Sequence, residues 1–119
     1  MRFLCIYKPS KPEGTPPTQQ EMANMGKLIE EGMKSGQLLA TEGCLPSALG
    51  ARVRLSKGTY TVTDGPFTES KELVAGFALI EAKSKDEAKE YVKRFLQVAG
   101  DGETEMRQIF EPGMEFGRP

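Results

Sequence analysis

One acidic residue, in the segment TDGPF at residues 63–67, stands where an acid could do chemistry. Alternation along the preceding run puts Asp64 in line with Tyr60 and Val62, toward the face that we expect to be buried. A carboxylate at the rim of an apolar cleft can act as a general acid or base. An Asp before Gly-Pro also fits an Asx turn, in which its side chain accepts backbone N–H groups, so the catalytic and structural roles both stay open.

A set of polar side chains could bind substrate beside this acid. Two guanidiniums on one face of a strand can hold a carboxylate or a phosphate, although pairing with acids of a neighbouring strand is the alternative. The set comprises Tyr7, Glu42, Arg52, Arg54, Glu69 and Lys71.

Two of these candidates lie in a charged segment after the TDGPF motif, where Glu69 and Lys71 either orient a polar ligand or only face solvent. Phe67, in the motif itself, is expected to plug the core, with a stacking platform as the alternative. Tyr7 ends an apolar strand and leads into a proline-rich loop at residues 8–17. That loop either closes over a pocket or only connects two elements.

The sequence contains no histidine. This removes the imidazole base of Ser-His and Cys-His catalysis and the common nitrogen ligand of zinc, copper and iron. Cys5 and Cys44 are far apart and outside any CxxC spacing, so we expect both to be buried, reduced thiols. We therefore expect a protein without a metal or a cofactor, in which carboxylates and phenols are the groups that handle protons.

Length and charge exclude several classes of protein. A chain of 119 residues with 38% hydrophobic and 28% charged residues is expected to form a single domain over 1–119. The net charge is −1 and the basic residues are interspersed with acids, which argues against a nucleic-acid partner. No apolar run approaches the roughly 20 residues that span a bilayer. The apolar stretch at residues 3–7 reads as a strand and not as a signal peptide, so we expect a cytoplasmic protein that does not bind membranes.

Hydrophobic periodicity and capping residues predict two helices among several strands. The first helix begins at a capping box of Thr18 and Glu21, ends at Gly36, and is expected to bury Met22, Met25, Ile29 and Met33. A hairpin around Lys57-Gly58 should pair Ser56 with Thr59, Leu55 with Tyr60 and Val53 with Val62. The second helix begins after Ser84 and ends at Gly100. Strands are predicted at residues 2–7, 38–42, 73–82 and 103–111.

This order of elements favours an α+β fold, a ferredoxin-like split βαβ antiparallel sheet with both helices on one face. The strands at residues 2–7 and 73–82 are apolar on both faces, and the two helices can cover only one of them. A large exposed apolar sheet face is rare on a monomer. We therefore expect a homodimer in which a second copy covers the other face.

Several stretches resemble the YCII-related, DGPF-motif family over nearly the whole chain. They are ATEGCLP at residues 40–46, ARVR at 51–54, VTDGPFTESKE at 62–72, and the terminal FE at 110–111 with EFG at 115–117. The resemblance implies a dimeric α+β barrel, in which two sheets pack face to face. It also implies a bacterial family of mostly uncharacterised proteins, some of them fused to or encoded near extracytoplasmic-function sigma factors. Enzymes with a His-Asp pair have been proposed in the family, but this sequence has no histidine for that role.

The wider superfamily includes oxygenases, haem enzymes and binding domains, so the fold does not select a chemistry. Three hypotheses follow. The first is a metal-independent enzyme that acts on a small organic molecule, with Asp64 as acid or base and with Tyr7 and Arg54 orienting the substrate. The second is a small-ligand-binding or accessory module, in a setting such as sigma-factor transcription, and the third is a structural dimer without catalysis.

Overall fold

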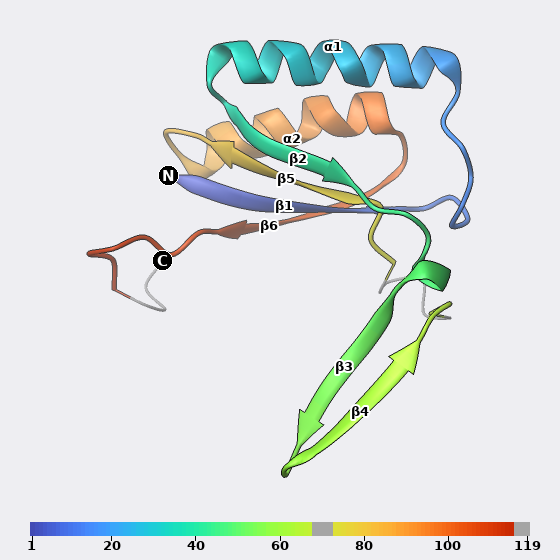
Figure 1. Ribbon diagram of the computed structural model, residues 1–119. Helices are drawn as coiled ribbons and strands as arrows, with labels where there is room; N and C mark the ends of the chain where they lie inside the picture. Colours follow the sequence, from blue (N-terminus) through green and yellow to red (C-terminus); the bar gives the residue numbers. More distant parts are fainter. Residues whose placement is uncertain (68–72, 116–119) are drawn as a thin grey trace.

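The computed structural model describes residues 1–67 and 73–115. Glu69 and Lys71 lie outside these described residues. None of the helices in the described ranges is both long and apolar enough to cross a membrane. The elements, shown in Figure 1, are β1 (Arg2–Pro9), α1 (Gln19–Ser35), β2 (Leu38–Gly43), a short 3-10 helix η1 (Ser47–Leu49), β3 (Ala51–Ser56), β4 (Thr59–Asp64), β5 (Gly76–Glu81), α2 (Lys85–Ala99) and β6 (Gly102–Gln108).

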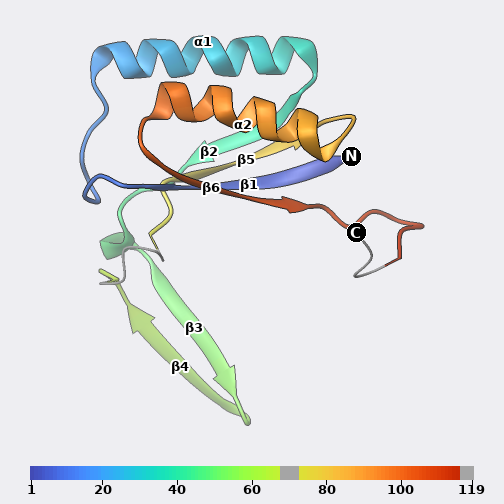
Figure 2. The same ribbon diagram turned by 180° about the vertical axis from the view of Figure 1, so that it is seen from behind.

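Four strands form an antiparallel sheet in the order β2-β5-β1-β6. Each helix links two strands that are separated in the sheet by a third, which is the split βαβ arrangement. Both helices lie on the same side of this sheet (Figures 1 and 2). The predicted ferredoxin-like α+β fold is therefore confirmed. We call the sheet and its two helices the body, and the sheet side that faces away from the helices the open face.

Alternation along β1 decides which residues enter the core of the body. Phe3, Cys5 and Tyr7 are buried beneath the helices, while the residues between them are only partly covered. Ile80 of β5 lies opposite Phe3 and is only 1% exposed. The core also contains Ala82, which precedes α2, and three residues of α2, namely Ala88, Tyr91 and Val92.

The predicted helix caps are present, but α1 is rotated from the expected orientation. Thr18 and Glu21 form the reciprocal capping box, and Gly36 ends the helix in the left-handed region at φ 80°. The prediction that Met22 and Met33 are buried was wrong, because these side chains are 54% and 47% exposed.

The physical reason for the rotation is the absence of a side chain at Gly32, which faces the body together with Leu28. A Cβ atom at Gly32 would lie 2.6 Å from the Tyr91 hydroxyl and 2.8 Å from the Cβ of Leu38. Only glycine allows this close approach of α1 to α2 and β2. Close packing at Gly32 therefore prevails over the wider stripe of methionines in setting which side of α1 is buried.

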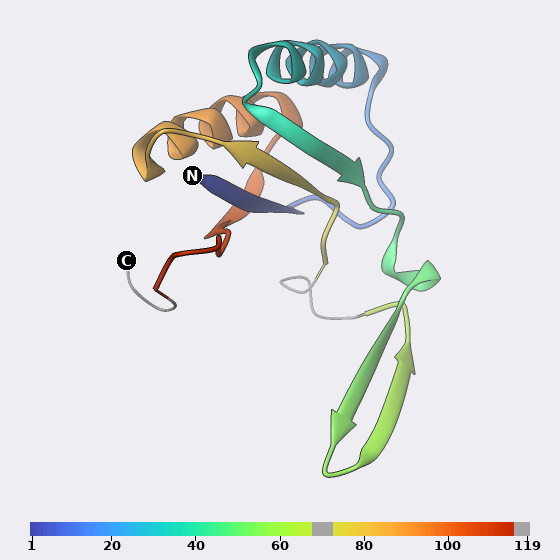
Figure 3. The same ribbon diagram turned by 60° about the vertical axis from the view of Figure 1, so that its left-hand side comes forward.

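Strands β3 and β4 form a separate two-stranded sheet, which we call the arm (residues 51–64). Its register is the predicted one, with Ser56 opposite Thr59, Leu55 opposite Tyr60 and Val53 opposite Val62. The arm extends away from the body on the side opposite to the helices (Figures 1 and 3). The radius of gyration of 16.2 Å reflects this extension, because a compact domain of this length would have a value of about 13–14 Å.

Candidate functional site

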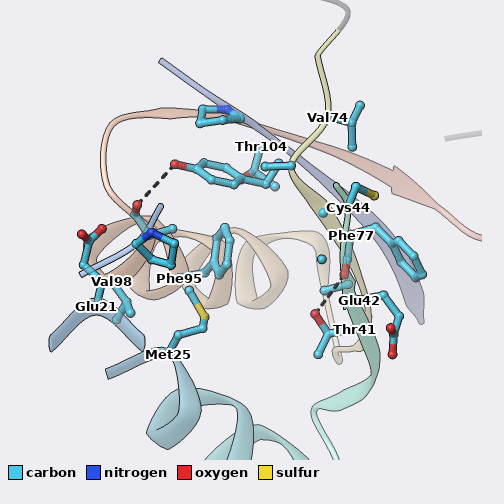
Figure 4. Close-up of a pocket in the computed structure, with 18 of the residues that line it drawn as sticks. Glu21, Met25, Thr41, Glu42, Cys44, Val74, Phe77, Phe95, Val98 and Thr104 are labelled. Carbon is cyan, nitrogen blue, oxygen red and sulfur yellow. Dashed lines mark hydrogen bonds between the residues drawn. The ribbon is translucent and has the colours of Figure 1, made fainter. Parts of the chain in front are cut away.

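A pocket of about 990 Å³ lies between the sheet, the two helices and the proline-rich loop. This volume is at the upper end of the range of about 300–1,000 Å³ that is typical of ligand sites. Its walls are mainly apolar and include Ile29 of α1. Figure 4 shows Met25 of α1 and Phe95 and Val98 of α2 in the same wall. Cys5 and Tyr7 of β1 contribute the wall on the sheet side. The arrangement suits a small molecule with a substantial apolar surface.

Tyr7 is held by the chain segment that joins α2 to β6. Its hydroxyl lies 3.1 Å from the Gly100 carbonyl oxygen, with the carbonyl oxygens of Ala99 and Asp101 at 3.4 and 3.3 Å. Its ring meets Phe95 edge to face, with 5.1 Å between the ring centroids. Burial, together with the negative charges of Asp101 and Glu21, raises the pKa of Tyr7 above its ordinary value of 10.0. Tyr7 is therefore a protonated phenol at neutral pH and offers the pocket an aromatic surface.

Thr104 of β6 lies directly opposite Tyr7 of β1 and lines the same pocket (Figure 4). Its hydroxyl oxygen is buried and makes no hydrogen bond within the part of the chain that the structure describes. Leaving a buried hydroxyl unpaired costs about 1–3 kcal/mol, so such groups usually have a partner. This hydroxyl can bond a polar group of a bound molecule.

Glu21 lies at the rim of the pocket, and its carboxylate already binds other groups of the chain. It accepts a hydrogen bond from the Thr18 backbone N–H at 3.0 Å and lies 3.3 Å from the Lys11 ammonium. The Thr18 backbone and side-chain hydrogen bonds and Lys11 together hold the pKa of Glu21 below its ordinary value of 4.5. Glu21 is therefore a stable anion that begins α1 and anchors the proline-rich loop, and it does not exchange protons near neutral pH.

Glu42 contributes to the pocket wall, but its carboxylate faces the other way. Glu42 is paired with Phe77, which is in turn paired with Ile6, so the three side chains share the open face. Figure 4 shows Glu42 and Phe77 pointing away from Met25 and Phe95. The neighbouring Thr41 lies toward the helices and donates its hydroxyl to the Phe77 carbonyl at 2.9 Å.

Asp64 ends β4 at the base of the arm and is exposed. The face that alternation assigns to it is not buried within the chain, because Tyr60 and Val62 are 71% and 61% exposed. The prediction of a buried orientation was wrong, since the arm does not join the main sheet. Among residues 1–67 and 73–115, no hydrogen-bond partner of the Asp64 carboxylate is found, and Ser47 provides the turn contacts instead.

Ser47 of η1 holds the TDGPF segment against the proline-rich loop. The Ser47 hydroxyl donates to the Glu13 carboxylate at 2.8 Å and accepts from the Phe67 backbone N–H at 3.0 Å, and the Ser47 backbone N–H also donates to Glu13. We call these contacts the Ser47 junction. A Cβ at Gly65 would collide with the Ser47 carbonyl, so the close contact requires glycine. The junction links a wall of the pocket to the base of the arm.

The two arginines of β3 belong to the arm and not to the lining of the pocket. The Arg52 guanidinium stacks on the Phe67 ring, 3.8 Å from its centroid. Phe67 is therefore a half-buried platform for this cation, and the prediction that it plugs the core was wrong. Arg54 is exposed on the same face of the strand.

The structure thus divides the predicted site between two places. Tyr7 and Glu42 contribute to the pocket, while Asp64, Arg52 and Arg54 lie along the arm. Sequence reasoning missed Thr104 and Ser47. Thr104 had a visible signal, because it is a polar residue two positions before the apolar Met106 in an alternating run. Ser47 had none, since its partners come from distant segments.

The two cysteines differ in environment, and both are free thiols in the structure. Burial raises the pKa of Cys5 to about 11, so this thiol is protonated and unreactive. Cys44 is exposed, which contradicts the expectation that both are buried. It directly follows β2, lines the pocket, and donates its backbone N–H to the Ala75 carbonyl at 2.8 Å. Within the described ranges, no cluster of three or more Cys, Asp or Glu side chains is placed to hold a metal ion.

Comparison with known proteins identifies the family. The model of the YCII-related domain matches residues 1–112, so the chain belongs to that family. An uncharacterised protein of Rhizobium meliloti (strain 1021) is 29% identical over 98 residues, which cover 80% of this chain and 79% of the relative.

A solved structure has the same fold. It is the 5-chloro-2-hydroxyhydroquinone dehydrochlorinase of Burkholderia phenoliruptrix AC1100 in complex with 2,5-dihydroxybenzoquinone. Its TM-score is 0.51 at 19% identity, and the match covers 92% of this chain and 94% of that one. At this identity the likeness shows the fold alone.

Proposed function

We propose that this YCII-related protein binds a small, largely apolar organic molecule in the pocket between the sheet and the helices. The observation that carries the proposal is the buried Thr104 hydroxyl, which has no hydrogen-bond partner among the described residues, in a mainly apolar pocket of about 990 Å³. A ligand with one polar group would pair with this hydroxyl and bury its remaining surface against Met25, Ile29 and Phe95. The solved neighbour is an enzyme that acts on a small organic molecule, and this agrees with the class of ligand that we propose for this pocket.

Three ionisable groups that line the pocket favour binding over catalysis. Tyr7 and Cys5 have raised pKa values and stay protonated at neutral pH, because burial disfavours their anions. The pKa of Glu21 is lowered, chiefly by its hydrogen bonds with Thr18, and Glu21 stays ionised. An efficient acid–base catalyst has a pKa near the working pH, which none of these three groups has.

An enzyme that uses carboxylate chemistry without a metal or cofactor is the second candidate. Asp64 is its proposed acid or base, and the Ser47 junction supports this role by tying the segment after Asp64 to the loop that walls the pocket. Tyr7, Glu42, Arg52, Arg54, Glu69 and Lys71 are then the proposed substrate-binding set.

We also propose that the functional unit is a cytoplasmic homodimer. The open face carries Leu4, Ile6, Phe77 and Leu79 in paired positions of β1 and β5. Phe77 is 38% exposed, and the helices lie on the other side of the sheet. Packing of two open faces would cover these side chains.

A thermal-shift screen tests the pocket. The probes are substituted phenols, benzoates and short aliphatic acids and alcohols, and a compound that binds the folded protein should raise Tm in proportion to RT ln(1 + [L]/Kd). Thr104→Val removes the hydroxyl at nearly constant volume, so a polar hit should bind about tenfold more weakly, as expected for one hydrogen bond. Thr61→Val on the exposed arm is the matched control. A hit that binds equally well to Thr104→Val and Phe95→Ala would place binding outside this pocket.

A further inference from the structure

The arm presents a stripe of large apolar side chains to solvent. Val53, Leu55, Tyr60 and Val62 are 59–71% exposed. Their pairing across the hairpin places all four on the same side of the arm, and we call them the arm stripe. The reverse side carries Arg52, Arg54, Thr61 and Thr63, so only one side of the arm is apolar. This pattern is typical of a two-stranded ribbon that packs one side against another surface.

The arm cannot be stable through its own contacts. An isolated two-stranded hairpin is marginally stable at best in water. Among the described residues, the Ser47 junction ties the base of the arm to the proline-rich loop, and the hydrogen bond from Gly65 N–H to the Gly50 carbonyl at 3.0 Å closes that base. The strands beyond this base need a further surface.

The direction of the arm indicates what that surface is. The arm leaves the body on the side opposite to the helices, so it passes the space in front of the open face (Figures 1 and 3). Each arm strand has six residues. At about 3.3 Å per residue the arm is roughly 20 Å long, whereas two packed sheets lie about 10 Å apart. Any sheet that covers the open face therefore lies alongside the arm.

The open face alone offers few apolar contacts for a dimer. A standard interface involves about 20–30 residues and about 800 Å² on each side. The apolar part of the open face includes Leu4, Ile6, Phe77, Leu79 and Ala40. The side toward β6 is polar, because Lys8 and Arg107 both bind Glu105. In a two-fold dimer each surface patch contributes from both subunits. The two arm stripes would therefore add two apolar contacts to the one between the open faces.

We propose that the arm of each chain clasps the flank of a second copy when their open faces pack together, so that the arm stripe is buried only in the homodimer. This inference rests on the homodimer that belongs to the proposed function. It adds that the hairpin of each chain packs against the second copy and so contributes to holding the dimer together. The Ser47 junction would then connect dimer assembly to the wall of the pocket.

Sedimentation velocity over a concentration series tests the clasp. The double variant Leu55→Lys/Tyr60→Lys should raise the dimer dissociation constant at least tenfold, because it places charge in the buried stripe. Thr61→Lys, on the polar side of the same strand, is the matched control and should change it less than about threefold. Phe77→Lys places a charge on the open face and therefore tests whether packing of the open faces forms the dimer.

The outcomes separate the two ideas. Dissociation by Phe77→Lys with no effect of the stripe variant would refute the clasp and keep the dimer. A wild type that stays monomeric would refute both, while pocket binding in the thermal-shift screen would remain a separate result. Circular dichroism verifies that the variants fold.

A second measurement uses the wild-type protein. Lys57 is at the exposed tip of the arm, so trypsin cleavage there should slow as the concentration passes the dissociation constant. Cleavage at the same rate at all concentrations, in a protein that dimerises, would contradict the clasp.

Discussion

The body and the arm are built from equally regular alternation, but they differ in what covers their apolar residues. In β1 the alternate residues Phe3, Cys5 and Tyr7 are buried beneath helices that the same chain supplies. In the arm Val53 and Val62 are equally well paired, yet they are 69% and 61% exposed. Alternation therefore shows which side of a strand is apolar. It does not show which surface covers that side.

The largest expected difference between the two regions is in stability. Ile80→Ala leaves a cavity in the core of the body, where Ile80 is 1% exposed, and should lower the free energy of unfolding by about 2–5 kcal/mol. Val62→Ala in the arm should lower it by less than about 0.5 kcal/mol in dilute solution, where the arm is uncovered. Urea unfolding followed by circular dichroism measures both. Equal losses in dilute solution would show that the arm packs against its own body.

A substitution at the boundary between the body and the arm should cause the next largest loss of stability. Ser47→Ala removes the hydroxyl that bonds both Glu13 and Phe67, and we expect a loss of about 1–2 kcal/mol. The direction of the arm should also become less defined, which would broaden the distance distribution from small-angle X-ray scattering. Ser56→Ala, near the tip of the arm, is the control. An unchanged scattering profile for Ser47→Ala would show that the junction does not orient the arm.

Asp64 tests whether the base of the arm does chemistry. Asp64→Asn and Asp64→Ala should each change the free energy of unfolding by less than about 0.5 kcal/mol, because the carboxylate is exposed. Asp64→Asn should abolish any turnover of a compound that binds the pocket while leaving its affinity unchanged. Steady-state assays and thermal shifts measure the two effects. A stability loss above about 1 kcal/mol in Asp64→Asn would instead indicate a structural ion pair, and the acid–base role would be discarded.

The smallest effect is a pH dependence at the start of α1 in the body. The pKa of Glu21 is lowered, first by the Thr18 N–H hydrogen bond, so the folded state favours its ionised form. Its contribution to stability is fully present above the ordinary value of 4.5 and is lost as the pH falls through the lower, folded value. Urea unfolding across the acidic range should show a shallower loss of stability in Glu21→Gln than in the wild type. Identical pH profiles would contradict this role.

Local features and the fold class were predicted well from the sequence, whereas the packing contacts between distant segments were not. The Thr18 capping box, the Gly36 helix end and the hairpin register depend on residues within a few positions of one another. The exposure of Met22 and Met33 was missed, because the orientation of α1 depends on close contacts of Gly32 with other elements.

The sequence by itself determined the elements, their caps and the order of strands and helices, since these follow from periodicity and from local hydrogen bonds. The tertiary structure alone decided which residues meet in the pocket and which lie on the arm. Tyr7 faces Thr104, and Glu13 meets Phe67 through Ser47, across long stretches of chain. These contacts form only when packing of the core places distant segments side by side, and no spacing in the sequence encodes that placement.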